Sequence, residues 1–187
     1  ARAVVVITQG LKDFYVQRGI SQEKIIVAHD GVDVRVFADQ ESKEDARKRL
    51  GLPLDKKIAL YIGRVDGWKG ANVFFEAANF FPSDIIAVVI GGEKKQVNIL
   101  RQKYPKVIFL GYRPYRELQH NQAAGDVLVL PNTGKDGISA LFTSPLKLFS
   151  YMTSGRPIVA SDLQSVREIL NEDLCFFVQP DDPYALA

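Results

Sequence analysis

The sequence has few of the residues that mark metal centres and disulfide-stabilised proteins. Its single cysteine, Cys175, cannot form a disulfide within the chain, which favours a reducing compartment. The two histidines and the acidic residues form no cluster with metal-ligand spacing. We therefore expect a protein without a bound metal.

Long hydrophobic runs and an excess of one charge are also absent. The longest clean apolar runs, such as residues 85–90, are far shorter than the roughly 18 residues that a membrane-spanning helix needs. No signal-peptide pattern occurs either. The 24 Lys and Arg residues nearly balance the 22 Asp and Glu residues, so the net charge is +2. These features argue against a transmembrane segment and against a dedicated nucleic-acid binder.

What the sequence does contain is the composition of a globular protein. Its 187 residues are 47% hydrophobic and 25% charged, which is enough apolar material for one folded domain. Short runs rich in β-branched residues alternate with amphipathic stretches. We expect strands at residues 4–8, 25–28, 58–62, 85–90, 107–110, 127–130, 157–160 and 175–178.

Most of these apolar runs are continuous rather than alternating, which is typical of strands buried on both faces of a parallel sheet. Strand–helix alternation then predicts a Rossmann-like, doubly wound α/β fold, in which ligands bind beyond the carboxyl ends of the strands. One predicted helix has Leu146, Phe149 and Met152 as its apolar face. A charged stretch at 40–49 predicts a solvated surface helix that ends at Gly51.

Two cations follow the predicted strand that ends at Gly63. Arg64 and Lys69 flank a turn, and a helix is predicted to begin near Gly70. Arginine can bind two phosphate oxygens at once, lysine supplies a mobile point charge, and glycine lets a ligand approach the backbone closely. The pair suits a diphosphate, although two solvated surface cations would give the same pattern. Neither the P-loop order G-x-x-x-x-G-K-[ST] nor the dinucleotide-binding G-x-G-x-x-G follows a strand.

A second candidate site lies between residues 131 and 155. Its first part is polar and glycine-rich, as expected of a mobile binding loop. The segment Ser144-Pro145-Leu146-Lys147 then has the form of a helix start, with Ser144 as the N-cap and Pro145 as the first helical residue. Ser144 can serve only as a cap, or this helix start can also offer backbone N–H groups to a phosphate. The sequence leaves both interpretations open.

Several segments, in this order, resemble a known family. The matching pieces are residues 7–12, residues 25–33 with Phe37, Gly63-Arg64 with Lys69-Gly70, residues 109–112, residues 126–131 and residues 146–161. Together they resemble the C-terminal domain of group 1 glycosyltransferases, the retaining GT-B enzymes related to glycogen synthase. The resemblance covers nearly all of the chain and rests on the order of the pieces rather than on any one of them.

The resemblance implies one half of a GT-B fold, with residues 1–187 as the nucleotide-sugar-binding C-terminal domain and an N-terminal acceptor domain outside this chain. The implied reaction is a retaining hexosyl transfer from a UDP-, GDP- or ADP-sugar to an acceptor hydroxyl, without a metal or cofactor. Arg64 and Lys69 would be the catalytic pair, because their charge would stabilise the leaving diphosphate. The donor-binding residues would be Gly63, Tyr112, Ser144, Leu146, Lys147 and Ser150.

Two positions depart from the family pattern. The family's pair of glutamates around this helix, of which the second binds the donor ribose, falls at Phe142 and Ser150. The alternative function is therefore a non-catalytic nucleotide-binding or interaction module that has kept the fold and lost the ribose carboxylate. A sugar-nucleotide epimerase of the same fold is a third possibility.

The ends of the chain lead us to expect a piece of a longer protein. It begins with Ala1-Arg2 rather than Met and stops in a predicted helix start. The acceptor, a glycan or a lipid, would then be bound by the other half, and this piece alone would transfer no sugar. We expect a cytoplasmic location, with peripheral attachment to a membrane through the other half left open.

Overall fold

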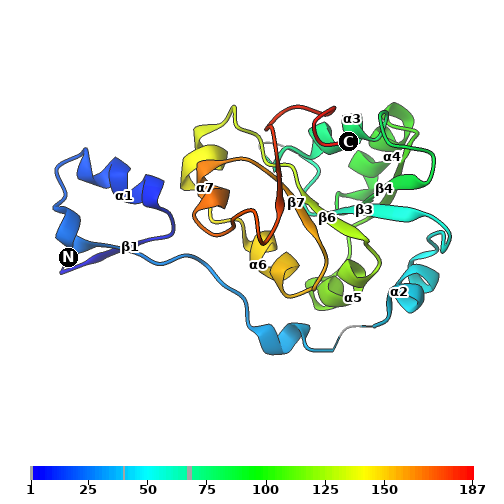
Figure 1. Cartoon of the computed structure of the whole chain (residues 1–187), viewed down its shortest axis with the longest axis horizontal. Helices are drawn as coiled ribbons and strands as arrows, with labels where there is room; N and C mark the ends of the chain where they lie inside the picture. The colour runs from blue at the N-terminus through cyan, green and yellow to red at the C-terminus, as the bar shows by residue number, and fades with distance from the viewer. Residues whose placement is uncertain (1, 40, 67–68) are drawn as a thin grey trace.

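The computed structural model describes residues 2–39, 41–66 and 69–187 and shows two parallel sheets (Figure 1). β1 and β2 form one sheet, and the other six strands form a second sheet in the order β5-β4-β3-β6-β7-β8. All eight predicted strands are present, divided between two sheets. They are β1 (Val4–Val6), β2 (Ile25–Val27), β3 (Lys57–Ile62), β4 (Ile85–Ile90), β5 (Val107–Gly111), β6 (Val127–Leu130), β7 (Ile158–Ser161) and β8 (Phe176–Val178).

Helices connect the strands, as the alternating pattern predicts. They are α1 (Gln9–Val16), α2 (Lys43–Leu50), α3 (Ala71–Ala77), α4 (Lys94–Lys103), α5 (Leu118–Ala123), α6 (Leu146–Met152) and α7 (Gln164–Arg167). Short 3-10 helices lie at Gln22–Lys24, Val34–Phe37 and Tyr115–Glu117, and a π-helix at Ile138–Phe142 precedes α6. Gly67 and Trp68, inside the predicted cation turn, and Gln40, at the start of the charged stretch, lie outside the described residues.

The six-stranded sheet carries an apolar core on each face. Ile58 and Leu60 of β3 belong to one core, which α2, α5, α6 and α7 cover, whereas Ala59 and Tyr61 belong to the other, which α3 and α4 cover. None of these four side chains is more than 4% exposed. The continuous apolar runs therefore become strands buried on both faces, and the doubly wound fold is confirmed.

The direction in which strands are added changes beside β3. From β3 the chain first builds outward through β4 and β5, and then returns to place β6, β7 and β8 on the other side. The connections from β3 and β6 therefore diverge at the carboxyl edge of the sheet. A crevice at such a switch point is where doubly wound sheets bind their ligands.

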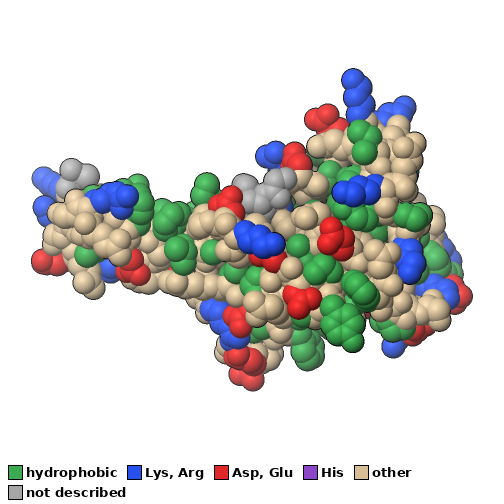
Figure 2. Space-filling view, turned by 90° about the horizontal axis from the view of Figure 1, so that it is seen from above, with side chains coloured by type: hydrophobic (Ala, Val, Ile, Leu, Met, Phe, Trp, Pro, Cys, Tyr) green, Lys and Arg blue, Asp and Glu red, His purple; other side chains and the backbone are tan. Residues whose placement is uncertain are grey.

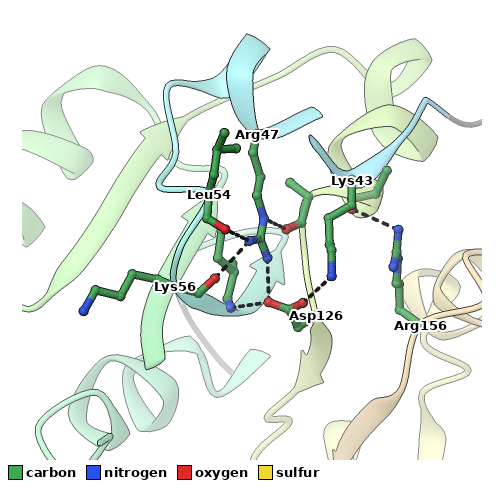
Figure 3. A network of polar contacts seen from close by, with 9 residues as sticks. Lys43, Arg47, Leu54, Lys56, Asp126 and Arg156 are labelled. Atoms are coloured by element: carbon green, nitrogen blue, oxygen red, sulfur yellow. Dashed lines mark hydrogen bonds and ion pairs between the residues drawn. The ribbon is translucent and has the colours of Figure 1, made fainter. Parts of the chain in front are cut away.

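A buried arginine fixes α2 to the sheet (Figure 3). Helix α2 ends at Gly51, which has a φ of 67°, as predicted, but Arg47 on this helix is only 3% exposed. Its guanidinium donates to the carbonyls of Ala124, at 3.0 Å, and Lys56, at 2.9 Å, and pairs with Asp126. The prediction of a fully solvated helix is thus wrong at Arg47, because carbonyl oxygens at the sheet edge need donors.

Asp126 is the acidic centre of this network. Besides Arg47, it accepts hydrogen bonds from the Ile58 backbone N–H, at 2.7 Å, and from the Lys43 ammonium, at 2.9 Å. Burial alone would raise the pKa of Asp126, but these hydrogen bonds outweigh it and lower the pKa below its usual value. The carboxylate therefore stays charged and ties α2, β3 and the start of β6 together.

The β1–α1–β2 unit, residues 4–27, projects from one end of the six-stranded body (Figures 1 and 2). It touches the body through the π-helix and α7: the Glu168 carboxylate accepts a hydrogen bond from the Gln9 N–H at 2.7 Å, and the rings of Phe14 and Phe142 lie edge to face. Gly10 packs so closely that an added Cβ would lie 2.4 Å from the Leu141 carbonyl oxygen. A side chain larger than that of glycine at position 10 would therefore push α1 away from the π-helix.

Candidate functional site

A cavity of about 580 Å³ opens at the carboxyl ends of β3 and β4. Its floor includes Ile62 and Ile90, and its walls come from α5, α6 and the loop 112–115. Residues 31–33 close one side; they belong to the segment between β2 and α2, called the connecting segment below. The cavity thus lies at the switch point of the sheet, beyond the carboxyl ends of the strands as predicted. An apolar hollow with a few polar groups at its edge is the usual form of a small-molecule site.

The cavity brings together five of the eight residues predicted to form the site. The predicted residues that line it are Gly63, Tyr112, Leu146, Lys147 and Ser150. Arg64 lines an adjoining hollow together with Asp66, Glu93 and Tyr112. Tyr112, at the end of β5, therefore lies between the two hollows, and its side chain is 73% exposed.

Lys147 reaches from α6 to the end of β3. Its ammonium donates to the Tyr61 hydroxyl at 3.1 Å and lies 4.2 Å from the centre of the Tyr61 ring. An added Cβ at Gly63 would lie 2.8 Å from this ammonium, so the glycine leaves room for it. Gly63, Tyr61 and Lys147 therefore form one cluster, although Lys147 comes from a distant segment of the sequence.

Burial, and to a lesser extent the positive charge of Lys69, lower the pKa of the Lys147 ammonium to about 7. The Tyr61 hydroxyl donates to the Arg64 carbonyl oxygen at 2.6 Å. Burial is also the main cause that raises the pKa of Tyr61, so its hydroxyl stays neutral and cannot offset the lysine's charge. An anion bound beside Lys147 would therefore stabilise the protonated form of this lysine.

Arg64 and Lys69, the predicted catalytic pair, differ in their surroundings. Arg64 is exposed and forms an ion pair with Asp66, with 3.0 Å between Nε and Oδ1. Lys69 is half-buried, and its pKa is lowered first by burial and then by the charge of Arg64. Lys69 thus feels the charge of Arg64, and Lys147 feels the charge of Lys69. Cations this close to one another favour an anion beside them.

The structure contradicts the predicted role of Ser144 as a helix cap. Helix α6 begins at Leu146, with Pro145 in the N-cap position rather than in the first turn, and its N-terminus has no side-chain cap. The buried Ser144 hydroxyl instead accepts a hydrogen bond from the Asp30 N–H at 3.2 Å. Ser144 therefore ties the connecting segment to the start of α6. The sequence could not reveal this, since the two residues are 114 positions apart.

The predicted apolar face of α6 is also wrong. Leu146 is 62% exposed and Met152 is 44% exposed, whereas Leu148 and Tyr151 are fully buried. The buried Tyr151 hydroxyl accepts from the Ile62 N–H at 2.9 Å. The two faces were exchanged because a helix this rich in apolar residues offers two candidate stripes, and hydrophobicity alone does not distinguish them.

Ser150 lines the cavity, but its hydroxyl is already occupied. It donates to the Lys147 carbonyl oxygen at 2.8 Å and accepts from the Gln122 amide at 3.0 Å. Gln122 is fully buried on α5. Ser150 therefore joins α5 to α6 and has little hydrogen-bonding capacity left for a ligand.

Tyr61, Asn121 and Gln122 contribute to the site but were missed by the sequence analysis. Tyr61 lies within an apolar strand run, and the other two lie on a short polar helix. One sequence signal was available: Asn121 and Gln122 come directly before Ala123-Ala124. A helix with these alanines is expected to pack on the sheet, and the neighbouring polar side chains are then buried with them. In the structure, Asn121 is 1% exposed and lines the cavity.

None of the helices within residues 2–39, 41–66 and 69–187 has both the length and the hydropathy that crossing a bilayer requires. The same residues contain no group of three or more His, Cys, Asp or Glu side chains placed to hold a metal ion.

The sequence matches the family model described as glycosyl transferases group 1 over residues 56–187. It is similar to the D-inositol 3-phosphate glycosyltransferase of Xylanimonas cellulosilytica, at 27% identity over 185 residues that cover 90% of this chain and 42% of that protein. It is also similar to TuaC of Bacillus subtilis, named as a teichuronic acid biosynthesis glycosyltransferase, at 28% identity over 153 residues that cover 82% and 37%. The chain therefore spans less than half the length of these relatives.

Solved structures share the fold. Anabaena HepE, crystallised with UDP-glucose, has a TM-score of 0.79 at 22% identity, over 100% of this chain and 52% of that one. The C-terminal domain of the group 1 family protein LpcC from Francisella tularensis has a TM-score of 0.65 at 24% identity, over 84% of each chain. The sequence match and the shared fold together show that this chain belongs to the glycosyl transferases group 1 family, as the C-terminal-like half of a GT-B fold.

Proposed function

We propose that the chain is the donor-binding half of a retaining glycosyltransferase, with residues 1–187 holding a nucleoside diphosphate sugar. The observation that carries the proposal is the position of Lys147 beside Gly63 in the lining of an apolar cavity, with Lys69 close enough to lower its pKa and Arg64 in the adjoining hollow. The cations suit a diphosphate, and the apolar walls suit a base and ribose. The half that holds the acceptor, a glycan or a lipid, lies outside this chain.

The charge of the cation group also suits the proposed chemistry. When the bond between the sugar and the diphosphate breaks, negative charge grows on the leaving group. Arg64 and Lys69 stabilise this charge, while Lys147 holds the diphosphate at the end of β3. Cations fixed by an aromatic hydroxyl and an ion pair need little reorganisation as the charge develops. The donor is a UDP-, GDP- or ADP-sugar, and the proposal requires neither a cofactor nor a metal.

A calorimetric titration tests this function. The chain is titrated with UDP, GDP and ADP, with the matching nucleosides as controls. Arg64→Ala and Lys69→Ala should each weaken diphosphate binding by about 10- to 150-fold, since a hydrogen bond to a charged group contributes about 1.5–3 kcal/mol. The nucleosides should bind both variants as they bind the parent. Unchanged diphosphate affinity in both variants would show that neither Arg64 nor Lys69 binds the diphosphate.

One observation favours a second candidate, a nucleotide-binding module without catalysis. The hydroxyl at position 150, where the family's ribose glutamate falls, makes bonds to Gln122 and Lys147. Restoring a carboxylate there discriminates between the two candidates. For a donor site, Ser150→Glu should tighten UDP binding about tenfold, because the carboxylate accepts charge-assisted bonds from the ribose hydroxyls. A folded Ser150→Glu protein that binds no tighter favours the non-catalytic module.

A further inference from the structure

Three of the polar side chains around the cavity are engaged by other residues. Ser150 donates to a carbonyl and accepts from Gln122. Asp33 accepts two side-chain hydrogen bonds from Arg35. Lys147 lies against Tyr61 at the end of β3. Ser150 and Asp33 are therefore already paired with other protein groups, while Lys147 serves the proposed diphosphate.

Asn121 on α5 has a polar group to spare. The Arg49 Nη1 donates to its Oδ1 at 3.1 Å. A guanidinium carries donors and no acceptor, so the amide oxygen must face Arg49 and the amino group must face away from it. Within the described residues, no hydrogen bond engages this amino group. Because Asn121 is 1% exposed and lines the cavity, the amino group is the polar part left for a ligand.

The orientation of Asn121 is fixed from behind. Arg49 also pairs with the Glu41 carboxylate, to which its Nε donates at 2.9 Å. Arg49 thus connects a surface carboxylate to a buried amide. A donor whose direction is set before the ligand arrives loses less conformational entropy on binding.

The neighbours of Asn121 indicate which part of a nucleotide it meets. Leu118, one turn earlier on α5, lines the same cavity, as do Tyr112 and Tyr115 of the adjoining loop. These apolar and aromatic surfaces suit a nucleoside. The cations that suit the diphosphate come instead from the end of β3 and from α6.

We propose that the Asn121 amino group donates a hydrogen bond to an oxygen of the bound nucleoside, either a base carbonyl or a ribose hydroxyl. This inference rests on the proposed function and adds to it the residue that recognises the nucleoside. Asn121 is then a specificity-determining residue, whereas Arg49 and Glu41 position it. The diphosphate contributes nothing to this contact.

The test compares two probes, UDP and inorganic pyrophosphate, by calorimetry. Asn121→Leu keeps the branching and the number of side-chain heavy atoms and removes the donor. It should weaken UDP binding about 5- to 50-fold, because a buried nucleoside oxygen loses its partner, and leave pyrophosphate binding unchanged. Equal UDP affinity in the parent and the variant would overturn the inference, as would equal losses for the two probes. A parent that binds no UDP would instead contradict the proposed function itself.

Three further arms keep the result interpretable. Arg49→Met breaks the same hydrogen bond but keeps the Asn121 amino group, so it should cost UDP affinity less than Asn121→Leu; an equal loss would make Asn121 merely structural and overturn the inference. Asn121→Ala, which adds no volume, replaces the leucine variant if that one fails to fold. UDP that lacks both ribose hydroxyls identifies the acceptor: a loss that persists indicates a base carbonyl, and a loss that vanishes indicates a ribose hydroxyl.

Discussion

The β1–α1–β2 unit and the six-stranded body are built from the same kind of sequence but are buried very differently. In the body, Leu60 and Val88 on adjacent strands are fully buried. In the unit, Val5 and Ile26 are also partners in a parallel pair, yet they are 65% and 53% exposed. A continuous apolar run therefore identifies a strand without showing how many layers cover it.

The difference teaches where stability and function reside. Parallel strands are normally covered on both faces, and a two-stranded sheet is marginal by itself. The body has a core on each face, and the cavity is lined by the body and by residues 31–33. We therefore expect the unit to depend on the body, and the body with its cavity to be largely independent of the unit.

The largest expected effect breaks the body itself. Gly70 has a φ of 67°, and an added Cβ would lie 1.7 Å from the Pro131 carbonyl oxygen. Gly51 has the same φ but open space around it. Gly51→Ala should cost about 1–2 kcal/mol of unfolding free energy from the left-handed backbone alone. Gly70→Ala should cost about 4 kcal/mol or more, because a backbone clash is added.

Urea unfolding of the two glycine variants measures this difference, and Gly51→Ala serves as the control for backbone strain. Similar losses would mean that the loop after β6 moves aside easily. The start of α3 and the loop would then be a poor support for the Lys69 side of the site.

The next effect separates the unit from the body. Gly10→Val places branched carbon atoms against the Leu141 carbonyl oxygen, where even a Cβ would lie at 2.4 Å. We expect hydrogen exchange to accelerate across residues 4–27 by about tenfold or more, equivalent to roughly 1.4 kcal/mol of local stability. Exchange across β3 should stay as in the parent.

Gly137→Ala is the control for the clash at position 10, because it also replaces a glycine but nothing lies within 4 Å of the added Cβ. Accelerated exchange in β3 as well as in the unit would show that the two regions unfold together. The comparison between a dependent unit and an independent body would then be false.

An effect of similar size concerns the charge at the cavity. Lys147→Met should weaken UDP binding by about 1.5–3 kcal/mol, since a charged donor to the diphosphate is lost. Lys147→Arg keeps a charge and should retain part of the affinity. Isothermal titration of both variants checks this, and a methionine variant that binds like the parent would place the diphosphate elsewhere.

The smallest effect is the dependence of the same binding on pH. The Lys147 ammonium has a pKa of about 7 in the folded chain, so it loses its proton as the pH rises through that value. UDP affinity should therefore fall between about pH 7 and 9, and binding should take up protons. Lys147→Arg should remove this dependence, because arginine stays charged. Proton uptake is measured from binding enthalpies in buffers of different ionisation enthalpy.

Folding stability should change with pH in the opposite sense. The lowered pKa means that the folded chain resists charging Lys147, so the penalty is complete below about pH 7 and shrinks toward pH 10. Lys147→Met should therefore gain stability over the parent at neutral pH and lose that advantage in alkali. The same lysine thus weakens the fold and strengthens anion binding.

Much of the fold followed from the sequence because strand burial leaves a direct trace in composition. The run at residues 85–90 is apolar throughout, and β4 is confirmed over the same residues, Ile85–Ile90. Gly51 and Gly70 marked a helix end and a helix start, since each adopts a left-handed conformation that other residues avoid. The division into two sheets left no such trace, because β1 and β2 have the same apolar pattern as the rest.

The site was predicted less completely, because its contacts join distant segments. Gly63 and Lys147 were identified separately, and their contact through Tyr61 appears only in the fold. Ser144 was assigned a local role as a helix cap, but its hydroxyl instead accepts a hydrogen bond from the distant Asp30 N–H. A tertiary hydrogen bond that satisfies a buried hydroxyl has no signature in the local sequence.

The most direct test of the central claim is a crystal structure of the chain with UDP. We predict that the diphosphate lies beside Gly63 and Lys147 and that the uridine fills the cavity between Leu118 and Tyr112. A second apolar hollow lies on the outer face of α6, lined by Val34, Phe149 and Met152 among others. UDP bound there, or bound with its diphosphate away from Lys147, would contradict the account.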